Sequence, residues 1–285
     1  MIIQLDPHIS EADKTRVSDK IQEIGYKANE VHTQMGHYLV AIGKKDFDPR
    51  KIGSLSGVLD IHRVTDNYKL VSRKWKVKPT IIDLGDGVEI GEENFSMMAG
   101  PCSIESEQQI ESVLQELAKL GIRIMRGGVY KPRSSPYSFR GLGIDGLKLW
   151  ASKAKEHGIK IITEVMQVSQ IEAMADYIDV YQVGARNTQN FNLLDALGEV
   201  DMPVLLKRGI SGTLEELLHS AEYIFSGGNE LIMLCERGIR SYEKAYRNTM
   251  DINAIAMLKE KSHLPVIADP SHGIGIRAFV EPVAL

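Results

Sequence analysis

Residues 203–238, PVLLKRGISGTLEELLHSAEYIFSGGNELIMLCERG, contain one complete strand–helix–strand unit. Two short apolar runs, at 204–206 and 231–234, have the near-continuous hydrophobicity of parallel strands that are buried on both faces. Between them, Thr213 is a good N-cap for a helix, and Gly227-Gly228 follow its expected end. The stretch therefore predicts two parallel strands joined by a return helix.

Similar runs recur along the chain, and nearly every one ends in a polar cluster. From Ala99 to Asp269 the mean step between clusters is about 28 residues, the length of one strand plus one return helix in a (β/α)8 barrel. The seven runs are SMMAGPCS (96–103), IRIMRGGVYKPRSSPYSF (122–139), IKIITEV (159–165), VYQVGARN (180–187), PVLLKRG (203–209), LIMLCERG (231–238) and PVIADPSH (265–272).

This spacing predicts an α/β protein with a (β/α)8 TIM barrel as its catalytic domain over residues 96–285. A doubly wound sheet is the alternative, but no Gly-x-Gly-x-x-Gly follows the first run, which weakens a nucleotide-binding interpretation. Only seven runs occur, and Leu285 falls in the helix expected after the seventh. We therefore expect the eighth β/α unit to be absent from this chain.

The first 75 residues have a different pattern. Strands are expected at IIQL, KANEVH, YLVAIG and VLDIHRV, with a helix from Ser10 to about Ile24 and a short one near Pro49–Ser54. The order βαββαβ predicts a small α+β ferredoxin-like domain over residues 1–75, with a regulatory or a purely structural role. Residues 76–95 form a linker and a predicted hairpin, IIDLGDGVEIG, that could plug the bottom of the barrel.

Gross composition excludes several classes of protein. A net charge of −4 gives no reason to expect nucleic acid or an anionic membrane as a partner. The start, MIIQLDPH, lacks the features of a secretory signal, and no apolar run approaches the roughly 18 residues of a membrane span. Two cysteines, Cys102 and Cys235, suit a reducing compartment. We predict a cytoplasmic enzyme.

Basic residues gather at the predicted strand ends, where barrel enzymes carry their catalytic groups. Seven cations at one barrel mouth would repel one another, so a multiply charged anionic substrate is expected there. Arg208 is the member that could most easily point outward or pair with Glu164 or Glu236. The set is Arg126, Lys131, Arg133, Arg186, Lys207, Arg208 and Arg237.

Cys102 and His272 lie at the ends of the first and seventh runs. In a closed barrel only the eighth strand separates these two positions, so both side chains could hold one divalent metal, such as Mn, Fe, Zn or Co. Two ligands do not complete a site, and at least one carboxylate is missing. Asp269 could orient a ligand or cap the backbone, Glu164 is placed for pairing with a ligand, and Cys235 is expected in the core.

The ordered motifs GPCS, RGGVYKPRSSPYSF, GARN, LLKRG, ERG and DPSH closely resemble the 3-deoxy-D-arabino-heptulosonate 7-phosphate (DAHP) synthase family, in the subgroup with an N-terminal ferredoxin-like regulatory domain. The resemblance covers the whole chain. It implies a condensation of phosphoenolpyruvate with erythrose 4-phosphate that releases phosphate, the first step of the shikimate pathway. It also implies a homotetramer.

The resemblance assigns a role to each cluster. Phosphoenolpyruvate would be held by Arg126, Lys131, Arg186, Lys207 and Arg237, and the phosphate of erythrose 4-phosphate by Arg133 and Ser134. Cys102 and His272 would hold the metal as a Lewis acid, and Lys131 is the candidate for proton handling. The family completes its metal site with a Glu and an Asp of the eighth unit, for which Glu281 is no substitute. On this basis we expect impaired turnover and retained phosphoenolpyruvate binding.

Two alternatives remain. The related 3-deoxy-D-manno-octulosonate 8-phosphate synthases use arabinose 5-phosphate. In those enzymes this loop resembles lysine-alanine-asparagine-arginine, which differs from the KPRSSPYS of this chain. A non-catalytic sensor would bind an aromatic amino acid at residues 1–75 and use the barrel as a scaffold. In the enzyme interpretation tyrosine or phenylalanine would be a feedback inhibitor, with residues 30–37 as the candidate effector edge.

Overall fold

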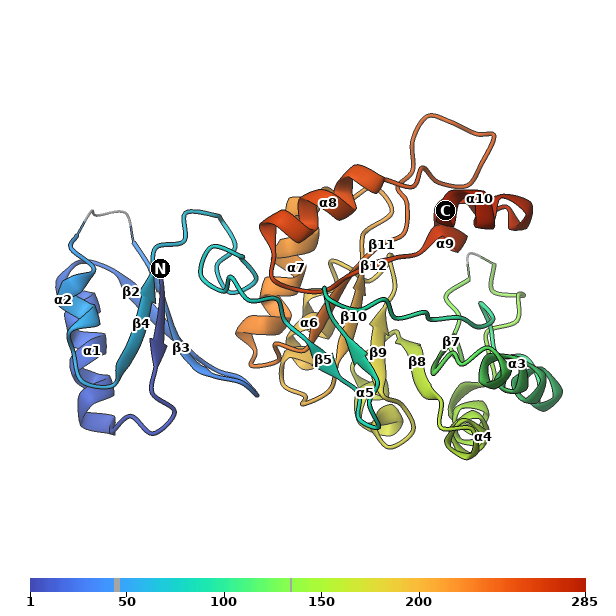
Figure 1. The fold of residues 1–285 in the computed structure, drawn as a ribbon, viewed down its shortest axis with the longest axis horizontal. Coiled ribbons are helices and arrows are strands. Elements are labelled where there is room, and N and C mark those ends of the chain that lie inside the picture. Colours follow the sequence, from blue (N-terminus) through green and yellow to red (C-terminus); the bar gives the residue numbers. More distant parts are fainter. Residues whose placement is uncertain (44–46, 134) are drawn as a thin grey trace.

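The computed structural model describes residues 1–43, 47–133 and 135–285. Its N-terminal part is an antiparallel sheet with strand order β2-β3-β1-β4 (Figure 1). The chain order is β1 (Ile2–Leu5), α1 (Glu11–Glu23), β2 (Lys27–His32), β3 (His37–Ile42), α2 (Arg50–Gly53) and β4 (Val58–His62). The predicted βαββαβ order is therefore present.

The two faces of this antiparallel sheet have different partners. Because side chains alternate along a strand, Ile3 and Leu5 of β1 point to one face and pack with Val17 and Ile21 of α1. Ile2, Val31, Tyr38 and Val40 point to the other face and join the large core of the C-terminal part. The N-terminal sheet is thus packed between its own helices and the rest of the molecule.

The C-terminal part is built on a six-stranded parallel sheet with the order β12-β11-β10-β9-β8-β7, which is the order of the chain (Figure 1). Its strands are β7 (Ile124–Gly127), β8 (Lys160–Val165), β9 (Val180–Val183), β10 (Val204–Lys207), β11 (Ile232–Glu236) and β12 (Val266–Ala268). Sequential parallel strands with helical returns form a half-barrel, which confirms the predicted α/β class.

Helices cover the outer face of this sheet. They are α3 (Glu107–Lys119), α4 (Gly143–Glu156), α5 (Ser169–Ala175), α6 (Phe191–Gly198), α7 (Leu214–Ser226) and α8 (Ile252–Lys261), followed by the short α9 (Pro270–Ile274), η1 (Arg277–Phe279) and α10 (Val280–Ala284). The expected cap of α7 is present as a full capping box between Thr213 and Glu216. Within the described residues no helix is both long and apolar enough to cross a lipid bilayer.

The first of the seven predicted strands is not a strand in the structure. Only Ala99 forms a parallel bridge, to Met125 of β7. The next residue, Gly100, has a φ of 146°, and a Cβ there would lie 2.2 Å from the carbonyl oxygen of Arg126. Pro101 has no amide hydrogen to donate. These two residues end the ladder after one pair, while the segment still runs beside β7.

The predicted hairpin forms from β5 (Ile82–Asp83) and β6 (Glu89–Ile90). Its apolar side chains, including Ile82 and Ile90, pack against the inner face of the parallel sheet at Ile124, Ile162 and Val180. These three residues lie at or near the beginnings of their strands. The hairpin therefore covers the end of the sheet where the strands begin, as expected.

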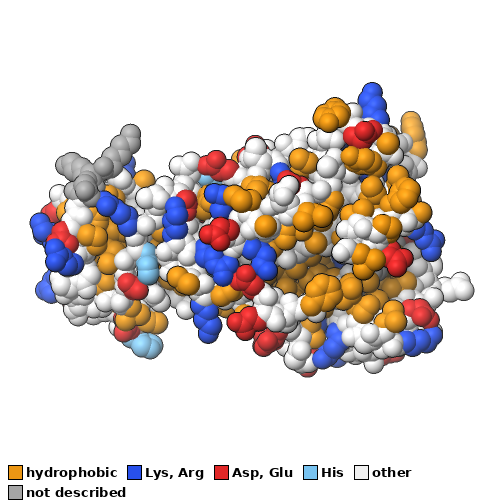
Figure 2. Space-filling view, turned by 45° about the horizontal axis from the view of Figure 1, so that its top comes forward, with side chains coloured by type: hydrophobic (Ala, Val, Ile, Leu, Met, Phe, Trp, Pro, Cys, Tyr) orange, Lys and Arg blue, Asp and Glu red, His pale blue; other side chains and the backbone are white. Residues whose placement is uncertain are grey.

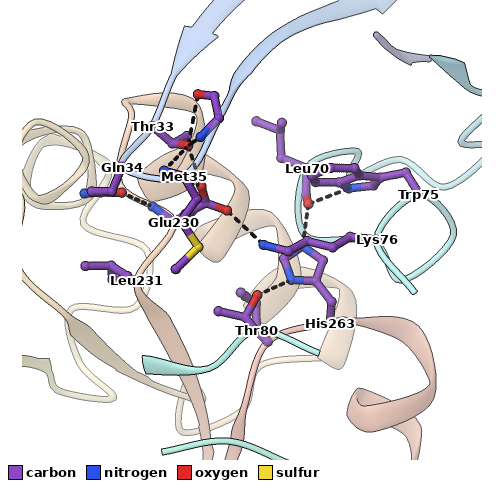
Figure 3. Close-up of polar contacts among 12 residues, drawn as sticks. Thr33, Gln34, Met35, Leu70, Trp75, Lys76, Thr80, Glu230, Leu231 and His263 are labelled. Carbon is purple, nitrogen blue, oxygen red and sulfur yellow. Dashed lines mark hydrogen bonds and ion pairs between the residues drawn. The ribbon is translucent and has the colours of Figure 1, made fainter. Parts of the chain in front are cut away.

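The N-terminal domain docks at the same end of the sheet. Glu230, which precedes β11 and has no exposed surface, accepts hydrogen bonds from the Thr33 hydroxyl and from the Met35 amide at 3.1 Å (Figure 3). Lys76 of the linker forms an ion pair with the same carboxylate at 3.0 Å. Tyr38 stacks edge-on with Trp75, at 5.2 Å between ring centroids.

Figure 2 shows how surface side chains are distributed on one face of the molecule. Charged groups crowd over the small domain and its junction, whereas hydrophobic side chains gather over the larger part. The two parts therefore present chemically different surfaces on this face.

Candidate active site

The inner face of the parallel sheet changes from apolar to polar along four of its strands, β7 to β10. Ile124 of β7 lies in the floor beside the hairpin, and Arg126, two residues later, lines a cavity above it. The same step of two residues recurs on three neighbouring strands, since alternate side chains share a face. The pairs are Ile162 and Glu164, Val180 and Gln182, and Leu205 and Lys207.

The cavity above this floor lies at the carboxyl ends of the strands and has a volume of about 400 Å³. Eight basic side chains line it, against one carboxylate among its described lining residues, that of Glu164. The cations are Arg126, Lys131, Arg133, Arg186, Lys207, Arg237, Arg240 and Arg247. Such a density of positive charge favours a small ligand with several negative charges.

Burial makes two of these cations depend on an anionic partner. Lys131 and Arg237 are each at most 8% exposed, whereas the equally buried Lys207 already forms an ion pair with Asp269 at 2.7 Å. Burial, and then the charge of Arg126, lowers the pKa of Lys131, and burial also lowers the pKa of Arg237. A bound phosphate or carboxylate would restore the stability of the charged forms.

Arg126 is held in position by an amide relay. Its Nε donates to the side-chain oxygen of Gln182 at 2.8 Å, and the Gln182 amide nitrogen donates to Glu164 at 3.2 Å. Gly184 makes room for this relay, because a Cβ there would lie 2.1 Å from Oε1 of Glu164. Arg126 thus lines the cavity with its guanidinium fixed at Nε.

Cys102, Lys131, His272 and Asp269 form a connected group at one side of the cavity. Lys131 Nζ lies 3.3 Å from the Cys102 sulfur and donates to the Cys102 carbonyl oxygen at 2.7 Å. Hydrogen bonding to His272 and the nearby charge of Lys131 lower the pKa of Cys102 to about 6, although burial opposes the shift. Cys102 is therefore mostly a thiolate at neutral pH.

Asp269 orients the imidazole of His272. Its Oδ2 lies 2.7 Å from His272 Nδ1, and Oδ1 accepts from the His272 amide at 3.1 Å, which caps α9. Burial opposes ionisation of Asp269, but the hydrogen bond with His272 and the charge of Lys207 outweigh it and lower the pKa. With Nδ1 facing Asp269, Nε2 is the ring nitrogen available to Cys102.

These residues fit a divalent metal. A thiolate and an imidazole whose other nitrogen meets a carboxylate are the donors and the support that borderline transition metals use. The carboxylate of Glu164 lines the same cavity. The structure thus brings Cys102 and His272 together, as predicted, with Asp269 in the orienting position.

Six of the seven cations expected at the barrel mouth line the cavity; Arg208 does not. It forms ion pairs with Glu236 at 2.8 Å and Asp251 at 2.9 Å, in line with the pairing expected for it. Cys235 is buried in the core, as expected. Ser134 lies outside the described residues.

The sequence interpretation missed Arg240 and Arg247. Both line the cavity from the segment between β11 and α8, which contains no strand or helix. A connection of this length after a barrel strand often carries function, and this was the available signal.

Comparison with known proteins identifies the relatives of this chain. The model of the DAHP synthetase I family matches residues 76–284. The phospho-2-dehydro-3-deoxyheptonate aldolase of Thermotoga maritima is 44% identical over 288 residues, which cover 100% of this chain and 84% of that protein. The crystal structure of the T. maritima DAHP synthase matches 99% of this chain and 83% of its own, with 43% identity and a TM-score of 0.76.

A more distant relative is the 2-dehydro-3-deoxyphosphooctonate aldolase of Acidithiobacillus ferrooxidans, which is 33% identical over 197 residues, or 66% of this chain and 69% of that protein. The T. maritima match is both stronger and more complete. The family model covers well over half of the chain, and the T. maritima protein matches the chain from end to end. The chain therefore belongs to the DAHP synthetase I family.

Proposed function

We propose that this protein is a DAHP synthase that condenses phosphoenolpyruvate with erythrose 4-phosphate and releases phosphate. The observation that carries the proposal is the cavity of eight cations at the carboxyl ends of the strands. Both substrates are phosphorylated, and phosphoenolpyruvate adds a carboxylate, so their charges complement the cavity. The similarity to the T. maritima enzyme along the whole chain supports the same activity.

Phosphoenolpyruvate would occupy the inner part of the cavity. Its phosphate and carboxylate would be bound by Arg126, which Gln182 holds in position, and by the buried Lys207 and Arg237. Lys131 and Arg186 would complete the set. In the condensation, carbon 3 of phosphoenolpyruvate attacks the aldehyde, water adds at carbon 2, and phosphate leaves. Substrate held by rigid strand ends reacts in a defined orientation.

Erythrose 4-phosphate would enter from the outer side. Arg133 is exposed, and its Nε donates to the Phe139 carbonyl oxygen at 3.1 Å, which anchors the loop. Arg133 and Ser134 are proposed to bind the sugar phosphate. Lys131, whose lowered pKa eases release of a proton, is proposed to protonate the developing alkoxide.

Cys102 and His272 are proposed to hold the divalent metal, which when bound acts as a Lewis acid toward the aldehyde. Mn, Fe, Zn and Co all suit thiolate and imidazole ligands. The short contact between Lys131 and the Cys102 sulfur keeps the thiolate available in the metal-free protein.

Regulation and assembly belong to the same proposal. Tyrosine or phenylalanine is proposed as an effector of the N-terminal domain, and a cytoplasmic homotetramer as the assembly. The N-terminal domain docks through Glu230, at the strand-beginning end of the sheet, so an effector would act on the cavity from the opposite end.

The proposal is tested by following the ultraviolet absorbance of phosphoenolpyruvate after erythrose 4-phosphate is added, with Mn²⁺ and with EDTA. In line with the impaired turnover expected from the sequence, we expect a slow loss of absorbance that requires erythrose 4-phosphate and stops with EDTA. Loss with arabinose 5-phosphate alone would identify an octulosonate 8-phosphate synthase, to which the 33% identity of the A. ferrooxidans relative points. Tyrosine or phenylalanine binding without phosphoenolpyruvate binding would indicate the sensor.

A further inference from the structure

Three metal-ligating side chains converge on the hairpin of β2 and β3, far from the catalytic cavity in the fold. Glu30 and His32 are two residues apart on β2 and therefore share a face. His37 is the direct cross-strand partner of His32, next to a turn closed by a hydrogen bond from the Thr33 amide to the Gly36 carbonyl at 2.9 Å. The hairpin register thus brings two imidazoles and one carboxylate together.

Both imidazoles point the same nitrogen at the same oxygen. His32 Nε2 and His37 Nε2 each lie 2.8 Å from Oε1 of Glu30, and the two rings stack with centroids 3.8 Å apart. Within residues 1–43, 47–133 and 135–285, this is the one group of three or more His, Cys, Asp or Glu side chains whose ligand atoms could hold a metal.

The geometry requires only small adjustments to bind an ion. The three ligand atoms lie within 4.8 Å of one another. Ligands about 2.0–2.1 Å from a tetrahedral ion are about 3.3 Å apart, so the two contacts of Glu30 would open by about half an ångström. A rotation of exposed side chains supplies this movement.

The surroundings allow an ion to enter. The His37 side chain is 6% exposed and fixes the inner corner, whereas those of Glu30 and His32 are 34% and 65% exposed. Lys14 of α1 forms an ion pair with Glu30, with its Nζ 3.0 Å from Oε1, but the same Nζ also lies 2.9 Å from Oε1 of Glu11. Lys14 can therefore release Glu30 and keep an ion pair.

We propose that Glu30, His32 and His37 form a second metal site, for a transition-metal dication of the zinc class with water as the fourth ligand. Two imidazoles and one carboxylate are a ligand set that Zn²⁺ and Co²⁺ accept. The site is separate from Cys102 and His272 and contains no sulfur. Nothing in the proposed condensation requires it.

The position gives the site a structural consequence. The turn between His32 and His37 carries Thr33 and Met35, which bind Glu230 of the C-terminal part (Figure 3). A metal held by both strands would fix the hairpin directly beside this contact. Metal binding is therefore expected to stabilise the docked N-terminal domain.

The test is a Co²⁺ titration of the full chain after removal of metals, in a Cys102→Ser background that eliminates the thiolate ligand. We expect one Co²⁺ per chain, with no sulfur-to-metal charge-transfer band. His32→Gln, a substitution at an exposed position, should weaken Co²⁺ binding at least about tenfold. Loss of a group that only hydrogen-bonds to a metal ligand already costs about this much in metal affinity. Lys14→Met should tighten it, because the competing cation is gone.

The matched control is His62→Gln, which removes a partly exposed histidine paired with Asp60 on the same sheet. It should leave the affinity unchanged. The proposal is overturned if the Cys102→Ser protein binds no Co²⁺, if His32→Gln binds it as tightly as its parent, or if His62→Gln weakens it equally. Circular dichroism of each variant separates loss of the site from loss of the fold.

Discussion

Replacing Asp269 by Asn tests whether this carboxylate supports His272 as the proposed metal ligand. In the structure Oδ2 of Asp269 serves His272 Nδ1 and Lys207 Nζ, each at 2.7 Å, while Oδ1 caps the His272 amide. Asn retains the cap, because its single side-chain oxygen can accept from that amide. The amide nitrogen then faces the imidazole and Lys207.

The expected result follows from proton positions. An Asn nitrogen donates to His272 Nδ1, which places the imidazole proton on Nε2 and removes the lone pair that would bind the proposed metal. Loss of such a supporting carboxylate typically costs about 10–100-fold in metal affinity, or about 1.4–2.7 kcal/mol. Lys207 also loses its ion pair while it is only 5% exposed, so phosphoenolpyruvate binding should change as well.

Co²⁺ affinity, read from the thiolate charge-transfer band of Cys102, measures the effect. Asp251→Asn is the control, because Asp251 also caps a helix and pairs with a buried cation, Arg208, outside the cavity lining. Unchanged Co²⁺ affinity in Asp269→Asn, or an equal loss in Asp251→Asn, would refute the role given to Asp269.

Three further predictions concern other parts of the molecule. Alkylation of Cys102 in metal-free protein should rise with pH through about 6, where the pKa of this thiol lies. Cys235 should stay unmodified, because burial raises its pKa to about 12. Mass spectrometry measures modification at each site, and a midpoint of Cys102 alkylation near pH 9 would contradict this prediction. Glu230→Ala should lower the free energy of unfolding by up to about 3 kcal/mol, because Lys76 and the Met35 amide lose a buried partner. Urea unfolding measures the loss, and Glu23→Ala, which removes an exposed pair, should change stability by less than about 1 kcal/mol. Gly184→Ala should destabilise the protein by about 1–3 kcal/mol, because the new methyl group clashes with Glu164. Gly209→Ala should be tolerated, because a Cβ there would lie 3.7 Å from its nearest neighbour, and equal melting temperatures of the two variants would contradict this prediction.

The strands, the helices and most of the site could be predicted because their signals are local. Apolar runs and caps such as Thr213 fix the elements, and a strand end fixes which edge of the sheet a side chain reaches. Their positions at strand ends therefore predict that Arg126, Lys131, Lys207 and Arg237 lie together, and all four line one cavity.

The remaining features depend on contacts that the sequence does not display. The ladder at Ala99 ends because Gly100 takes an unusual φ beside Arg126. Arg240 and Arg247 come from a segment without hydrophobic periodicity, so no sequence pattern indicates that their side chains face the cavity. The group of Glu30, His32 and His37 requires the pairing register of two strands, which the alternation of one strand alone does not give.

Calorimetric titration of the metal-free chain with phosphoenolpyruvate tests the central claim that the cationic cavity binds this substrate. We expect one molecule per chain and, for Arg126→Gln, affinity that is roughly 10–100-fold weaker, since one hydrogen bond to a charged group contributes about 1.5–3 kcal/mol. Arg123→Gln is the control, because Arg123 precedes the same strand and binds the Asp86 carbonyl oxygen at the opposite end of the sheet. Affinity that survives Arg126→Gln, or falls equally with Arg123→Gln, would contradict the account.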